Sequence, residues 1–85
     1  MRLRGEDLTW SEVDGEMVLL DLRSSTYLTT NRTGTFLLRL LAEDRTRDEL
    51  VDAVVGEYEV PVERAALDTD AFLQSLTDRD LLEPS

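Results

Sequence analysis

The feature that most constrains the fold is a change in the spacing of apolar residues at Thr30. Before this residue, polar and apolar side chains tend to alternate with a period of two, which is typical of strands with one buried face. After it, apolar residues recur at the helical spacing of three and four. A chain of 85 residues with one such change is expected to form a single α+β domain, residues 1–85, with its strands first and its helices second.

Three strands are expected, over residues 8–14, 16–22 and 26–30. Asp14-Gly15 separates the first two strands. This dipeptide favours the type I′ turn of a two-residue hairpin, because both central residues of that turn need a positive φ. The second connection is also short and polar, so the strands should pair in chain order as an antiparallel meander.

Three helices are expected after the last strand. The first begins at Asn31, a good N-cap residue, and the second opens with a T-x-x-E capping box at Thr46. The third has Pro61 at or near its first position and runs to about Asp80. Residues 81–85 are expected as a short apolar tail. The order β-β-β-α-α-α, with short helices and tight turns, indicates a winged helix-turn-helix-like packing of a three-stranded antiparallel sheet on three helices.

The composition disfavours most enzymes and several kinds of partner. Cysteine and histidine are both absent, which removes thiol nucleophiles, thiolate metal sites and the commonest general base. The net charge of −10 opposes binding to nucleic acid or to an anionic membrane, because both need cations on the protein surface. The N-terminus lacks the apolar region of a signal peptide, and no apolar run could span a bilayer. We therefore expect a cytoplasmic, non-enzymatic protein without a cofactor, for which a basic or neutral peptide is a fitting partner.

Two acidic clusters, DTD over residues 68–70 and DRD over residues 78–80, resemble fragments of calcium loops. Both lie in the third predicted helix, where residues two apart point about 200° away from each other. Their carboxylates cannot converge on one ion, so the spacing indicates a solvated helix face and no metal site.

The third predicted helix has a core stripe and an apolar residue outside it. At about 100° per residue, six residues cluster on one side and form the core stripe: Val62, Ala65, Thr69, Phe72, Leu73 and Leu76. Leu67 lies outside this arc, beside the small Ala66. Anionic Glu63 and Asp70 flank it, and Gln74 lies at nearly the same angle as Leu67. A lone exposed leucine is common on folded proteins, but an apolar spot with an acidic rim is also a candidate binding feature.

The strand over residues 26–30, TYLTT, is a candidate docking edge. One outer strand of a meander is an edge, and this strand has no lysine or proline to block further pairing. A free edge beside an apolar helix shoulder is the geometry of β-augmentation, in which backbone pairing supplies affinity and side-chain pockets supply specificity. Two alternatives remain open: the tail over residues 81–85 covers the edge, or a second copy of the chain does.

The same segments resemble the PqqD-like family, also called precursor recognition elements of ribosomally synthesised and modified peptides. The resemblance covers residues 8–82 and rests on four motifs in a fixed order. They are YLTTNRTG at the strand-to-helix junction, R-T-x-x-E-L in the second helix, Y-x-V before the third helix, and D-x-x-A-F-L-x-x-L within it. Among its subfamilies, the chain is most similar to the leader-binding proteins of lasso-peptide gene clusters.

The resemblance implies a protein without catalytic activity that binds the N-terminal leader of a precursor peptide. The leader would add a strand to residues 26–30, in the groove against the third helix. The protein would present it to a separate, transglutaminase-like leader peptidase and, downstream, to a macrocyclase. Carried over position by position, the implied peptide-binding residues are Leu20, Leu22, Tyr27, Leu28, Thr29, Thr30, Glu63, Ala66, Leu67, Asp70, Leu73 and Gln74.

If this assignment holds, Leu67→Arg or Leu28→Pro should abolish leader binding and leave the fold intact. The alternative within the family is a peptide carrier for the biosynthesis of the redox cofactor pyrroloquinoline quinone. A winged-helix DNA-binding regulator is a further alternative, but its second helix would present acidic side chains to phosphates. A small enzyme comes third, since the sequence offers no nucleophile with a base.

Overall fold

The computed structural model describes residues 1–84 and contains the predicted antiparallel meander. Its strands are β2 (Leu8–Val13), β3 (Glu16–Asp21) and β4 (Thr26–Thr30), and their order in the sheet is β2-β3-β4. The first two strands end one residue earlier than predicted. Asp14 and Gly15 have φ values of 52° and 80°, so the β2–β3 turn has the predicted conformation.

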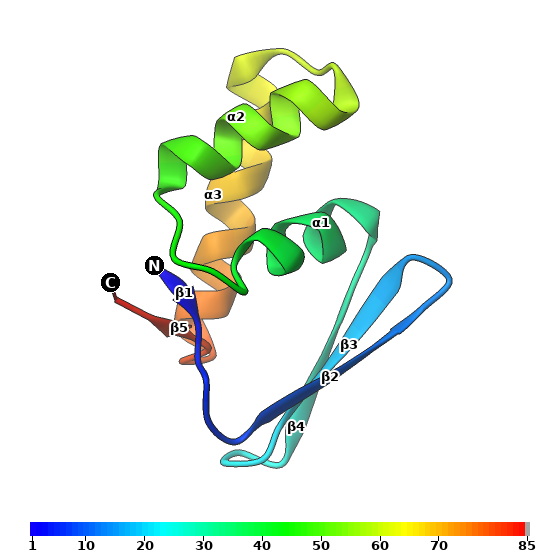
Figure 1. Ribbon diagram of the computed structural model, residues 1–85, viewed down its shortest axis with the longest axis vertical. Helices are drawn as coiled ribbons and strands as arrows, with labels where there is room; N and C mark the ends of the chain where they lie inside the picture. The colour runs from blue at the N-terminus through cyan, green and yellow to red at the C-terminus, as the bar shows by residue number, and fades with distance from the viewer. Residues whose placement is uncertain (85) are drawn as a thin grey trace.

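The three predicted helices are α1 (Arg32–Leu40), α2 (Arg47–Tyr58) and α3 (Val62–Asp78). The side chain of Asn31 caps α1 by accepting a 2.9 Å hydrogen bond from the backbone N–H of Gly34. Thr46 forms the capping box of α2, and Pro61 occupies the N-cap of α3. Figure 1 shows all three helices on one side of the sheet. The predicted fold class is therefore confirmed.

The two chain ends form a second, smaller sheet that was not predicted from the sequence. β1 (Arg2–Leu3) pairs antiparallel with β5 (Leu82–Glu83). The prediction of a simple apolar tail is therefore wrong for residues 82 and 83. The end of α3 lies close to the predicted Asp80: the helix ends at Asp78, Arg79 is its C-cap, and Asp80 has a φ of 57°. A left-handed residue ends a helix and turns the chain, here toward β5.

The core extends from the inner face of the sheet, where α1 packs on β3 and β4, to the space where α2 packs on α1 and α3. Its buried apolar residues are Leu3, Met17, Leu19, Leu37, Leu38, Leu41, Leu50, Val51, Val54, Ala65, Leu73, Leu76 and Leu81. Five of the six residues in the predicted α3 stripe are buried or half-buried. Val62 is the exception and is 52% exposed, because it lies in the first turn of α3, at the outer end of the helix layer. Over residues 1–84, no helix combines the length and the apolar character that crossing a membrane would require.

Candidate functional site

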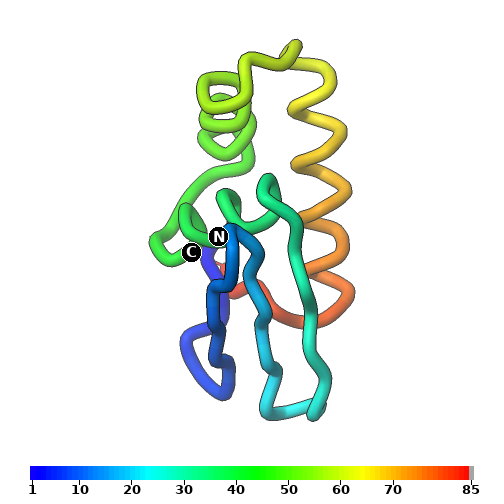
Figure 2. Tube along the Cα trace, turned by 90° about the vertical axis from the view of Figure 1, so that its right-hand side faces the viewer, coloured from blue at the N-terminus to red at the C-terminus, as the bar shows by residue number. Residues whose placement is uncertain are grey.

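β4 is an edge strand, and its free side opens along α3. It pairs with β3 on one side only, and the described part of the chain places no strand on its other side. Residues 82 and 83, which could have covered that side, pair with β1 instead. Figure 2 shows β4 and α3 side by side and running in opposite directions. This arrangement provides unpaired backbone groups next to a helix.

The β2–β3 turn determines which way the backbone of each strand points. In a two-residue type I′ hairpin, the residues that flank the turn form a hydrogen-bonded pair. Here these residues are Val13 and Glu16. Because the bonding direction alternates along an antiparallel strand, the even-numbered residues of β3 bond to β2 and its odd-numbered residues bond to β4.

The register of β3 with β4 then identifies the free donors and acceptors. Leu28 lies opposite Leu19, an odd-numbered residue, so its backbone groups face β3. Tyr27 and Thr29 lie opposite even-numbered residues, so their N–H and C=O groups point to the free edge. Four residues, 27–30, were expected to pair with a peptide backbone. Of these, only Tyr27 and Thr29 have backbone groups that are free to do so.

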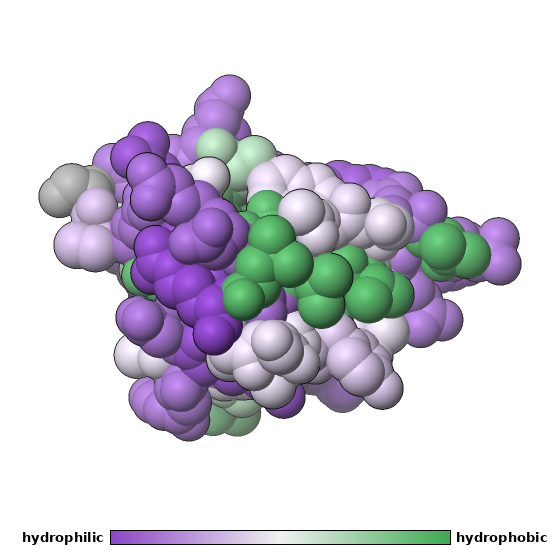
Figure 3. All heavy atoms as spheres, turned by 90° about the horizontal axis from the view of Figure 1, so that it is seen from below, coloured by the Kyte–Doolittle hydropathy of each residue, from purple (hydrophilic) through white to green (hydrophobic). Residues whose placement is uncertain are grey.

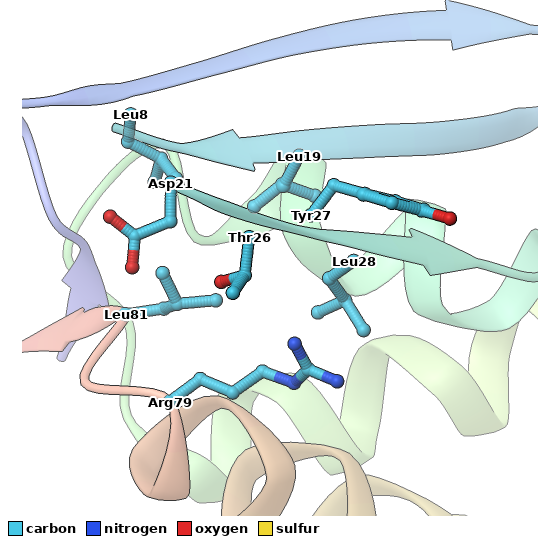
Figure 4. A pocket seen from close by; sticks show the side chains of 8 residues that line it. All are labelled: Leu8, Leu19, Asp21, Thr26, Tyr27, Leu28, Arg79 and Leu81. Atoms are coloured by element: carbon cyan, nitrogen blue, oxygen red, sulfur yellow. The ribbon is translucent and has the colours of Figure 1, made fainter. Parts of the chain in front are cut away.

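A small recess lies beneath the first half of β4 (Figure 4). Thr26 and Leu28 point down into it from the strand, and the side chain of Arg79 extends from the end of α3 along its lower wall toward Leu28. Tyr27 points away from the recess, and it is 69% exposed. The complete lining is Leu8, Leu19, Asp21, Thr26, Tyr27, Leu28, Arg79 and Leu81. Inward-pointing side chains of a strand added to β4 would meet this end of α3.

A larger hollow, of about 580 Å³, lies between the start of α1 and the middle of α3. It is lined by Asn31, Thr33, Gly34, Leu37, Arg64, Asp68, Ala71, Phe72 and Ser75. Gly34 allows α1 to come close to α3 here, because a Cβ at this position would lie 3.0 Å from both the Phe72 ring and the Thr30 Cβ. We call the recess and this hollow together the β4–α3 groove.

A buried ion pair fixes the geometry at the recess end of this groove. The guanidinium of Arg4 binds the carboxylate of Asp21, and it also donates 2.9 Å hydrogen bonds to the carbonyls of Glu6 and Asp80. Arg4 therefore ties the end of β3 to the end of α3. Mainly through the hydrogen bond from Arg4, the pKa of Asp21 falls from 3.8 to about 2. A hydrogen bond from Ser24 adds to this shift and also holds the turn into β4.

Comparison with known protein families identifies the chain. Residues 16–82 match the model of the family described as coenzyme PQQ synthesis protein D (PqqD). The chain belongs to the PqqD family. This finding confirms the resemblance seen in the sequence. No curated protein matches the PqqD-family chain at a significant level.

Two solved structures share the fold over nearly their whole length. The first is "TbiB1 in Complex with the TbiA(beta) Leader Peptide", with a TM-score of 0.88 and 32% sequence identity, covering 100% of this chain and 98% of that one. The second is "Lasso peptide synthetase B1 complexed with the leader peptide", with a TM-score of 0.82 and 30% identity, covering 98% and 96%. Both proteins were therefore solved with a leader peptide bound.

The α3 residues predicted as the groove wall lie elsewhere on this PqqD-family chain. Asp70 accepts two 2.8 Å hydrogen bonds from Arg47 of α2, which also lower the pKa of the Asp70 carboxyl. This shoulder of α3 therefore faces α2. Leu73 is buried in the core. The remaining predicted α3 residues lie outside the lining of the groove: Glu63, Ala66, Leu67 and Gln74.

Leu20 and Leu22 lie on the outer face of the sheet and do not line the groove either. The register places Leu20 on the same face as Val18 and Tyr27, away from the helices. Leu20 and Leu22 are 41% and 52% exposed. Figure 3 shows this side of the molecule as a band of apolar side chains with weakly polar neighbours. Of the twelve predicted site residues, Tyr27, Leu28, Thr29 and Thr30 remain at the edge strand, with Thr30 buried against Thr35.

The groove residues that were missed in the sequence come from the other shoulder of α3. They include Arg64, Asp68, Ala71, Ser75 and Arg79. Their signal in the sequence is a column of small residues, Ala71 and Ser75, one helical turn apart. Small side chains at that spacing leave room beside a helix, but they do not say on which side a strand will lie.

Proposed function

We propose that this protein is a non-catalytic recognition module for the leader of a ribosomally made precursor peptide of the lasso class. The leader binds as an added strand at β4, with alternate side chains in the β4–α3 groove. The observation that carries the proposal is the free edge formed by Tyr27 and Thr29 beside that groove. Two proteins of the same fold, at 32% and 30% identity, were solved with leader peptides bound, which supports it.

The bound leader is delivered to a transglutaminase-like leader peptidase, and the released core peptide passes to a macrocyclase. The protein itself supplies binding and no chemistry, which fits a sequence without histidine or cysteine. Over residues 1–84, no three acidic side chains lie close enough to hold a metal ion. Its work is done in the cytoplasm, where precursor peptides are made.

A second function, as a carrier for the peptide precursor of pyrroloquinoline quinone, is favoured by the family description alone. A DNA-binding role fits the surface poorly, because α2 carries five acidic residues and one arginine over Arg47–Tyr58 and its capping residue Glu59.

Titration with labelled peptides separates the two peptide-binding functions. We expect the TbiA(beta) leader, or the precursor encoded beside this chain's gene, to bind saturably, and the precursor of pyrroloquinoline quinone to bind far more weakly. Backbone amide resonances of Tyr27 and Thr29 should shift on binding. Preference for the quinone precursor would move the assignment to the carrier function, and failure of all three peptides to bind would refute leader recognition.

A further inference from the structure

Among residues 1–84, Arg79 has no ionic partner, and it lies at the recess end of the groove. The chain has nine arginines and no lysine. Seven of the nine have a carboxylate oxygen within 4.0 Å: Arg2, Arg4, Arg23, Arg39, Arg45, Arg47 and Arg64. Within residues 1–84, Arg32 and Arg79 are the two that remain. The chain has 19 acidic residues, yet none of those in the described part of the chain lies within 4.0 Å of the Arg79 guanidinium, beside the edge strand.

Two nearby carboxylates, those of Asp21 and Asp78, already accept hydrogen bonds from other residues. Asp21 lines the same recess, but it is bound by Arg4, by the Ser24 hydroxyl and by the backbone N–H of Arg23. Asp78, the residue before Arg79 in α3, accepts a 2.8 Å hydrogen bond from Gln74. The guanidinium of Arg79 thus faces the recess, next to the edge to which a strand would be added.

The backbone of Arg79 is held in place at the end of α3. As the C-cap of α3, it donates its backbone N–H to the carbonyl of Ser75, and the carbonyl of the next residue, Asp80, is held by Arg4. Its side chain points toward Leu28 in Figure 4, with Leu81 on the other wall of the recess. Arg79 is exposed in the free protein. An added strand would cover part of its guanidinium, so a carboxylate of that strand would bind it more strongly than at a fully exposed pair.

Building on the proposed function, we propose that Arg79 selects an acidic residue in the bound peptide strand. The aspartate or glutamate lies at a position whose side chain points toward α3, opposite Thr26 to Leu28. Side chains on this face of a strand recur every second residue, about 6.6 Å apart. The hollow beyond Thr30 would take a bulky apolar side chain of the same peptide. The preferred strand therefore carries an acidic and a bulky apolar residue two or four positions apart.

The composition predicts a basic or neutral peptide partner, whereas this inference places an acidic residue at one position of that peptide. The net charge of −10 favours a basic or neutral peptide overall. Charge complementarity inside a groove is local, however, because charges beyond about 10 Å are largely screened at physiological salt. A peptide that is neutral or basic in total and acidic at one position satisfies both conditions.

Selection from a random peptide library tests the inference, because the selection does not depend on the sequence of the natural leader. Wild type should enrich strands with aspartate or glutamate at one position, and Arg79→Glu should shift that position to lysine or arginine. Arg32→Glu is the matched control, since it changes the other unpaired arginine, outside the groove. An unchanged consensus in Arg79→Glu, or a wild-type consensus without an acidic position, would overturn the inference.

Titration then measures the contact itself. Arg79→Gln should bind an acidic peptide enriched in the selection about tenfold more weakly than wild type does. The affinity of the variant should also depend less on the salt concentration. The same peptide with its acidic residue changed to the amide should bind wild type and Arg79→Gln equally. If wild type binds neither library peptides nor the TbiA(beta) leader, strand addition itself fails and the inference fails with it. If wild type binds the acidic peptide and Arg79→Gln binds it with the same affinity, only the role of Arg79 is refuted.

Discussion

Replacing Thr29 with proline removes a backbone donor from the free edge of β4 and from nothing else in the sheet. Thr29 lies opposite Val18, and the alternation of the ladder points its N–H away from β3. Its side chain is exposed. Proline is tolerated at such a position in an edge strand, because no ladder hydrogen bond of the folded protein is lost. The variant therefore separates peptide binding from folding.

The expected loss of affinity has two causes. One hydrogen bond to the peptide is missing, and the peptide carbonyl that would accept it is left unpaired. A hydrogen bond contributes about 0.5–1.5 kcal/mol net, and a partner left unpaired in the complex costs about 1–3 kcal/mol. The two effects sum to about 1.5–4.5 kcal/mol, which corresponds to roughly 10-fold to 2,000-fold weaker binding at 25 °C. The free energy of unfolding should fall by only about 1 kcal/mol, the span of strand propensities.

Fluorescence polarisation with a labelled TbiA(beta) leader and urea unfolding give the two numbers. Thr29→Ala is the matched control, because it shortens the side chain and keeps the N–H, and its affinity should stay within about threefold of wild type. Leu28→Pro is the contrasting variant. The N–H of Leu28 faces β3, so this change should destabilise the fold itself by about 1–3 kcal/mol or more. Undiminished binding by folded Thr29→Pro would refute strand addition at β4.

Three further predictions concern the groove, the ion pair and the core. Ala71→Arg, in the groove lining, should weaken leader binding at least about tenfold by filling the hollow, while Leu67→Arg on the other flank should change it less than about twofold in the same titration. Arg4→Met should lower stability at neutral pH and flatten its decline in acid. The lowered pKa of Asp21 stabilises the fold above pH 3.8, and this contribution disappears as the pH falls toward 2, which urea unfolding at several pH values would reveal. Leu76→Ala, at a fully buried position, should cost about 2–5 kcal/mol of unfolding free energy in urea.

Local signals in the sequence predicted most of the fold. Asp14-Gly15, Asn31 and the Thr46 capping box each specify a conformation through their own backbone or through hydrogen bonds to residues three positions away. Such signals act independently of the rest of the chain. They place the turn and the starts of two helices, and together with the strand period they predict the edge position of β4.

Features that depend on distant residues could not be predicted in the same way. Arg4 resembles an ordinary surface arginine near the N-terminus, but it is 5% exposed and bonds to residues 17 and 76 positions away. The pairing of β1 with β5 likewise joins residues 2 and 3 to residues 82 and 83. Two strands of two residues each carry no period, so the apolar pattern could predict neither of them.

The helical period of α3 could not predict which of its two flanks lies beside the sheet. Helical spacing identifies the direction of the core, and the two flanks on either side of that direction are then equivalent. The apolar Leu67 drew the prediction to one flank, yet the ion pair from Arg47 to Asp70 shows that α2 packs there. The strand is consequently left with the opposite flank, where small Ala71 and Ser75 make room. A long-range charge pair between helices, rather than the apolar pattern of one helix, therefore indicates which face of α3 remains open to a peptide.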